Sequence, residues 1–102
     1  MNDYIFLMHD DVPSHADRGL DWAPYFERLR AAGAFQGGSA IGGGVCASKR
    51  GSTALTTHLS GYIRVKAADL TQARELVNGN PVFEAGGTVE IRELPRDDSE
   101  RA

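Results

Sequence analysis

The apolar positions of this chain fall into four short segments of strand type and two of helix type. Residues 4–9 form a continuous apolar run that ends at two aspartates, and they predict a strand buried on both faces. Residues 35–41, 58–65 and 88–94 predict three further strands, the last two with clear alternation of apolar and polar side chains. Glycines within 35–41 indicate a strand that is bulged or closely approached, and residues 49–53 have the composition of a hairpin tip.

Two segments carry apolar residues at helical spacing. Residues 21–32 form the first, with Asp21 as the predicted N-cap and Gly33 as the predicted stop. Asp69 is the predicted N-cap of the second helix, with a glutamine three residues later as in a capping box. Gly79 is expected to end this helix in the left-handed conformation.

The order βαββαβ is that of the α+β, ferredoxin-like fold, in which two helices cover one face of a four-stranded sheet. The first strand is expected in the centre, and both of its alternating sets of side chains are apolar. Since two helices cover one face only, we expect a second copy to cover the other in a homodimer. A lysine at Tyr4 or Phe6, whichever faces the partner, is expected to abolish that dimer.

Length, charge and cysteine content restrict the class of protein. The 102 residues fit one domain, predicted as residues 1–95, followed by a charged tail over residues 96–102. The 11 basic and 14 acidic side chains give a net charge of −3, which argues against a nucleic-acid partner. The single Cys46 fits a reducing compartment. Without a long apolar run or a basic leader, we expect a cytoplasmic protein with no membrane partner.

Several stretches carry a family resemblance. They are residues 4–9, the pattern Trp22-x-x-Tyr25-x-x-x-Leu29-x-x-Ala32-Gly33, Gly61-Tyr62-Ile63, and Asn80-Pro81 through Gly86-Gly87-Thr88-Val89-Glu90-Ile91-Arg92. On these residues the chain resembles the YCII-related proteins, especially the DGPF-type branch of small bacterial dimeric α/β barrels. The resemblance implies a fold and a dimeric assembly more than a particular reaction.

Two departures from the family pattern concern function. The Asp-Gly-Pro-Phe segment is missing, and residues 49–57 are shorter and different. Shorter family members carry a histidine and an aspartate proposed as a catalytic pair, and by register these positions hold Trp22 and Asn80 here. Neither side chain is an acid or base near neutral pH, so the pair does not carry over.

Three other groups of residues favour structural interpretations. Glycines within residues 37–44 lack the spacing of a phosphate-binding loop. The histidines and aspartates of residues 9–17 have no established ligand spacing, so we expect no metal site and no cofactor. Cys46 has no histidine partner in any motif and is interpreted as a bystander thiol.

Alternation on the third predicted strand indicates a candidate ligand site. If Ile63 and Val65 face the helices, then His58, Tyr62 and Arg64 share the opposite face, which a dimer would enclose. Arg64 would hold an anionic group and Tyr62 would hydrogen-bond to it. His58 is the candidate catalytic residue because it titrates near neutral pH. Further candidate ligand-binding residues are Gln36, His9 and Trp22.

These residues leave two functions open. The first is binding of a small acidic or aromatic molecule in a cavity at the sheet or dimer interface, with or without the activity of a cofactor-independent lyase, isomerase or dehalogenase. The second is a non-catalytic dimeric binding or assembly module with a structural polar interior. A deep pocket that touches His58 and Tyr62 would favour the first.

Overall fold

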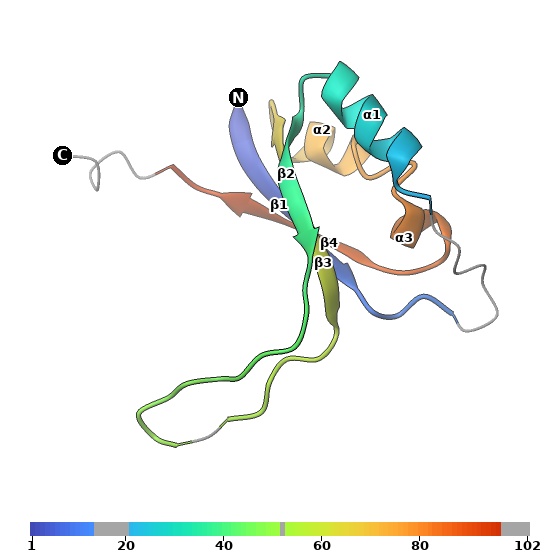
Figure 1. Cartoon of the computed structure of the whole chain (residues 1–102). Helices are drawn as coiled ribbons and strands as arrows, with labels where there is room; N and C mark the ends of the chain where they lie inside the picture. Colours follow the sequence, from blue (N-terminus) through green and yellow to red (C-terminus); the bar gives the residue numbers. More distant parts are fainter. Residues whose placement is uncertain (14–20, 52, 97–102) are drawn as a thin grey trace.

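The computed structural model describes residues 1–13, 21–51 and 53–96, which form an α+β fold around one four-stranded antiparallel sheet (Figure 1). In chain order the elements are β1 (Asn2–His9), α1 (Ala23–Ala31), β2 (Phe35–Ala40), β3 (Leu59–Ala67), α2 (Leu70–Glu75), α3 (Pro81–Glu84) and β4 (Val89–Leu94). The strand order β2-β3-β1-β4 places β1 in the interior of the sheet. The predicted ferredoxin-like fold is confirmed.

One face of the sheet, the inner face, packs against the helices and forms the core. Tyr4, Phe6 and Met8 of β1 are buried on this face. Phe6 is paired with Ile63 of β3 on one side and with Ile91 of β4 on the other. From the helix layer and its connections, the buried side chains of the core are Tyr25, Leu29, Ala73, Val77 and Val82.

The outer face of the sheet carries the second apolar set of β1. Ile5 and Leu7 alternate with the buried set and are half-buried. No helix of the described residues lies on this face (Figure 1). Because Tyr4 and Phe6 point into the core, a partner on the outer face would meet Ile5 and Leu7 instead.

The first helix begins one residue later than the predicted N-cap implies. Its N-cap is Trp22, so the prediction of Asp21 as N-cap is wrong by one residue. The Asp21 carboxylate nevertheless accepts a hydrogen bond from the Ala23 amide at 3.2 Å, and Pro24 has no N–H that it could bind. Gly33 follows the helix at φ 69°, which confirms the predicted stop.

The second helix is shorter than predicted, and a short helix that the sequence pattern did not predict, α3, follows Gly79. Asp69 caps α2 as predicted, and its carboxylate accepts a hydrogen bond from the Gln72 amide at 2.8 Å. The helix ends at Glu75, and Gly79 then adopts the expected left-handed conformation at φ 89°. Asn80 starts α3, because its side-chain oxygen caps two backbone amides of that short helix.

The glycine-rich strand β2 is bulged, as predicted. The register with β3 shifts between Phe35 and Gly37, and Gly37 has a φ of 119°. A β-carbon at Gly38 would lie 2.5 Å from the backbone oxygen of Tyr62, so only glycine permits this approach of the two strands. β3 begins at Leu59, one residue later than predicted.

Between β2 and β3 the chain leaves the sheet as a long arm (Figure 1). A turn at residues 49–51 lies near its end, within the predicted hairpin tip. The predicted loop at residues 11–19 falls largely on residues outside the described part, as does the predicted tail, of which only Arg96 is described. The Arg96 guanidinium donates to the Asp3 carboxylate at 2.9 Å.

Candidate functional site

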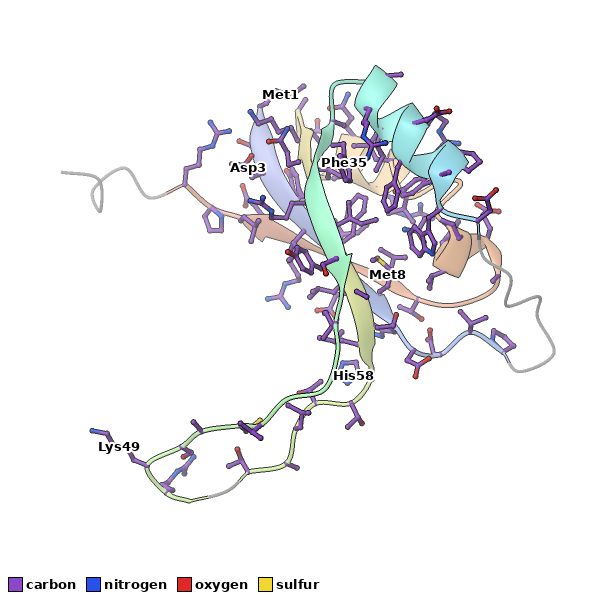
Figure 2. The ribbon with its side chains drawn as sticks, in the orientation of Figure 1. Met1, Asp3, Met8, Phe35, Lys49 and His58 are labelled. Carbon is purple, nitrogen blue, oxygen red and sulfur yellow. The ribbon has the colours of Figure 1, made fainter. Side chains whose placement is uncertain are left out.

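A cavity of about 500 Å³ lies between the sheet and the helices near the end of β2. Trp22 and Phe26 of the first helical segment form an aromatic wall, with ring centroids 5.6 Å apart in a stacked arrangement. Met8 and Ile63 line the cavity from the inner face of the sheet, and Figure 2 shows Met8 on the helix side. Val82 of α3 completes the apolar lining.

The cavity exists because side chains are short where β2 meets β3. In the register of this pair Gly38 lies opposite Ile63, and Ala40 lies opposite Gly61. Gly38, Ala40 and Gly61 all line the cavity, and none has a side chain larger than a methyl group. These three positions therefore contribute no large side chain that could fill the space between Met8, Ile63 and the aromatic wall.

The polar lining of the cavity is sparse and uncharged. Ser39, Ser60 and Tyr62 contribute to the lining from β2 and β3. Because Tyr62 lies opposite Leu7 in the strand register, its side chain is on the outer face and it borders the cavity through its backbone. The Ser39 hydroxyl donates to the Ala40 carbonyl at 2.9 Å, and the Ser60 hydroxyl donates to the Met8 carbonyl at 3.4 Å. Since no charged side chain lines the cavity, its chemistry suits a neutral aromatic ring better than a carboxylate.

A second polar group lies on the outer face, at the opposite side of the sheet. A ring nitrogen of His9, Nε2, is 3.0 Å from Oε1 of Glu90, and the other oxygen of Glu90 accepts from Arg92 at 3.1 Å. The His9 ring meets the ring of the exposed His58 edge-on, with centroids 5.0 Å apart. The hydrogen bonds from His9 and Arg92 lower the pKa of the Glu90 carboxyl below its ordinary value.

The predicted site residues thus occupy three places. Trp22 lines the cavity, and Tyr62 borders it through its backbone while its side chain lies on the outer face. His9 and His58 contact each other on the outer face. Arg64 is exposed, and its guanidinium donates to the backbone carbonyl of Gln36 at 3.0 Å. Within the described residues, no hydrogen bond joins His58, Tyr62 and Arg64, and their convergence on one cavity stays a prediction.

Sequence reasoning missed Phe26, Met8 and Glu90 as members of these groups. Phe26 and Met8 carry the same apolar signal as any core residue, so no pattern separates a cavity wall from a filled core. Alternation along the last strand places Glu90 and Arg92 on the same face, opposite to Val89 and Ile91. Its contact with His9 depends on the pairing of β1 with β4, which the sequence does not display.

Asn80 stands where the resembling family has an aspartate, and here its role is structural. The side chain is fully buried, and its oxygen accepts from the Val82 amide at 2.9 Å and the Phe83 amide at 3.2 Å. Nearby, burial raises the pKa of the Tyr25 hydroxyl to about 12, and this hydroxyl donates to the Leu76 carbonyl at 2.7 Å. The Asn80 bonds cap α3 and the Tyr25 bond joins α1 to the C-terminal end of α2, and these contacts offer no titratable group near neutral pH.

Within the described residues, no group of three His, Cys, Asp or Glu side chains is arranged to hold a metal ion. The same part of the chain contains no helix long and apolar enough to cross a membrane.

Comparison with known proteins gives the fold. No family model matches the sequence, and no curated protein matches it. Among solved structures, the chain is similar to 5-chloro-2-hydroxyhydroquinone dehydrochlorinase (TftG) from Burkholderia phenoliruptrix AC1100, in complex with 2,5-dihydroxybenzoquinone. The TM-score is 0.60 at 15% sequence identity, over 95% of this chain and 97% of that chain. This likeness shows the fold alone, and membership of the YCII-related family stays a prediction.

Proposed function

We propose that this protein binds a small planar six-membered ring, of the phenol, hydroquinone or quinone class, in the cavity between α1 and the sheet. The main support for this proposal is the cavity itself, which has a wall of the stacked Trp22 and Phe26 rings and an uncharged lining. Its volume of about 500 Å³ falls within the range of small-molecule sites. The shared fold with an enzyme whose structure holds a dihydroxybenzoquinone supports the same ligand class.

Trp22 provides a direct test, because it is the single tryptophan of the chain and lines the cavity. Titration with hydroquinone and methylhydroquinone, which are uncharged at neutral pH, is expected to quench its fluorescence saturably. The same ligands should raise the unfolding temperature, since a ligand at 100 times its dissociation constant adds about 2.7 kcal/mol of stability.

A matched pair of variants locates the binding. Ala40→Leu places a larger side chain at the cavity lining and is expected to weaken quenching at least several-fold. Ala31→Leu makes the same chemical change at an exposed position of α1 outside the cavity, and it should leave the affinity unchanged. Equal affinity in both variants, or an unsaturable response of the wild type, would contradict the proposal.

A homodimer through the outer face is part of the same proposal. Ile5 and Leu7 form a small apolar centre on this face, and the register places Tyr62, Arg64 and Arg92 beside them. An apolar centre with tyrosine and arginine around it is typical of protein interfaces. A second copy is the partner that would cover this face without another component.

A second candidate is a cofactor-independent lyase, isomerase or dehalogenase with its chemistry on the outer face. The observation that favours it is the pair of neighbouring imidazoles, His9 held by Glu90 and His58 beside it. In an elimination of HCl, His58 would take the proton while chloride leaves. Chloride release from a chlorinated hydroxyhydroquinone tests it, and His58→Ala should abolish release while the dimer persists.

A further inference from the structure

The arm, defined as residues 41–57, is the least packed part of the described chain. Figure 2 shows Lys49 at its tip, far from the sheet, and His58 at its base. Every described residue of the arm is exposed except the half-buried Cys46. Val45 is 91% exposed, and Ile41 and Leu55 are also exposed large apolar residues. Val45, the most exposed of the three, would be removed from water if another molecule covered this segment.

The internal bonds of the arm do not account for its extended form. At the base, the Ile41 amide donates to the Ser60 carbonyl at 3.1 Å, and near the tip the Gly51 amide donates to the Ser48 carbonyl at 3.1 Å. Between these points the described residues show one link across the arm, from the Cys46 thiol to the Ala54 carbonyl at 3.5 Å. An isolated two-stranded ribbon is marginal in water even with a full ladder.

Charge is divided unevenly between the arm and the rest of the chain. The arm carries Lys49 and Arg50 and no acidic side chain. Because the whole chain has a net charge of −3, the remainder carries −5. A basic tip on an acidic protein is electrostatically complementary to a second copy of the same protein.

Strand β4 offers a matching surface for the arm. It forms one edge of the sheet, with its outward backbone groups unpaired within the described strands. It carries the exposed Glu93, and also Glu90, which His9 and Arg92 already bind. Such an edge is a template for an added strand. The strand order puts β2 at the other edge, so the arm leaves the sheet away from the β4 of its own copy. The leg formed by residues 41–48 spans about 26 Å when extended, more than the roughly 14 Å width of a four-stranded sheet.

We propose that the arm of one copy docks along the free edge of β4 in a second copy, with Lys49 and Arg50 against the acidic side chains of that copy. The inference rests on the proposed pairing of two copies through the outer face. In this arrangement each copy holds the other at two places, and the apolar arm residues become covered.

The single cysteine of the chain, Cys46, lies in the arm and permits a direct test. A benzophenone attached to Cys46 is activated by light in an equal mixture of unlabelled and ¹⁵N-labelled protein. Mass spectrometry is expected to find crosslinks between copies, to peptides that contain residues 89–94. Crosslinks confined to one copy, or to other elements of the second copy, would overturn the proposal.

Charge reversal gives a second, independent test of the same proposal. Lys49→Glu with Arg50→Glu should weaken the dimer by about tenfold or more, and Glu93→Lys in the same chain should restore part of the loss. The matched control Arg30→Glu, on the exposed side of α1, should leave the dimer constant unchanged. A wild-type monomer by sedimentation would defeat both the outer-face dimer and the arm docking.

Suppose instead that the wild type is a dimer, that the Lys49→Glu, Arg50→Glu variant dimerises equally well, and that no crosslink reaches residues 89–94 of the second copy. This result would defeat the arm docking alone and preserve the outer-face pairing. Tight binding of a short duplex DNA to the wild type, lost on charge reversal while the dimer stays unchanged, would assign the arm to nucleic acid and overturn the proposal.

Discussion

At the scale of single residues, Gly79 shows how one backbone conformation separates α2 from α3. Its φ of 89° lies in the left-handed region, and a β-carbon there would lie 2.6 Å from a guanidinium nitrogen of Arg28. We expect Gly79→Val to lower the free energy of unfolding by about 1–2 kcal/mol, because a β-branched residue resists positive φ. Urea denaturation followed by circular dichroism measures this loss.

Two further variants separate the two possible causes of the loss at Gly79, the positive φ and the contact with Arg28. Gly42→Val, at a position with no atom within 4 Å of a built β-carbon, should change stability by no more than about 0.5 kcal/mol. In an Arg28→Ala background the loss at Gly79 should persist, because it arises from the backbone. If the loss disappears there, contact with the guanidinium and not the dihedral angle is its cause.

Glu90 is expected to make stability depend on pH. Its carboxyl pKa is lowered from 4.5 in the folded chain by hydrogen bonds from His9 and then Arg92. The folded state therefore releases its proton more readily than the unfolded state. The stabilisation is present above about pH 4.5 and is lost as the pH falls through the lower, folded value.

Glu90→Gln should accordingly flatten the fall in stability below pH 4.5, measured from urea midpoints on both sides of that pH. Glu93→Gln on the same strand is the control, since Glu93 forms no ion pair within the described residues. An equal slope for wild type and Glu90→Gln would show that the contact with His9 is absent in solution.

At the scale of elements, α2 depends on its cap because it is short. Asp69 accepts from the Gln72 amide at 2.8 Å, and the Gln72 side-chain oxygen accepts from the Ala68 amide at 2.5 Å. Asp69→Ala should lower the free energy of unfolding by about 1 kcal/mol. Hydrogen exchange should locate the loss at the Gln72 amide, and Asp21→Ala, where the N-cap is Trp22, should have a smaller effect.

At the scale of the whole molecule, a lysine is expected to have different effects on the two faces of β1. Phe6 is fully buried in the core, so Phe6→Lys should prevent folding. Leu7 is half-buried on the outer face, so Leu7→Lys should leave the monomer folded and weaken self-association. Sedimentation at low micromolar concentration and circular dichroism distinguish the two results. A Leu7→Lys protein that is folded and as dimeric as the wild type would exclude the outer face as the interface.

The sequence by itself determined the main elements and their order. Hydrophobic periodicity is a local property, and so are the cap at Asp69, the stop at Gly33 and the left-handed conformation of Gly79. The same information predicted the bulge of β2, since a glycine pair within a strand indicates close approach. It also selected Trp22, which lines the cavity, and Tyr62, which borders it through its backbone.

Only the tertiary structure decided where the chemistry of the chain gathers. The cavity depends on the pairing of β2 with β3, which brings the small residues Gly38, Ala40 and Gly61 below the aromatic wall of α1. The contact of His9 with Glu90 depends in the same way on the pairing of β1 with β4. Strand pairing joins residues that are distant in the chain, and parity along one strand reports a side chain's face but not its neighbours on the next strand. For that reason the sequence could place His58 and Tyr62 on one face of the sheet but could not show that His58 lies against His9 and that Tyr62 lies opposite Leu7.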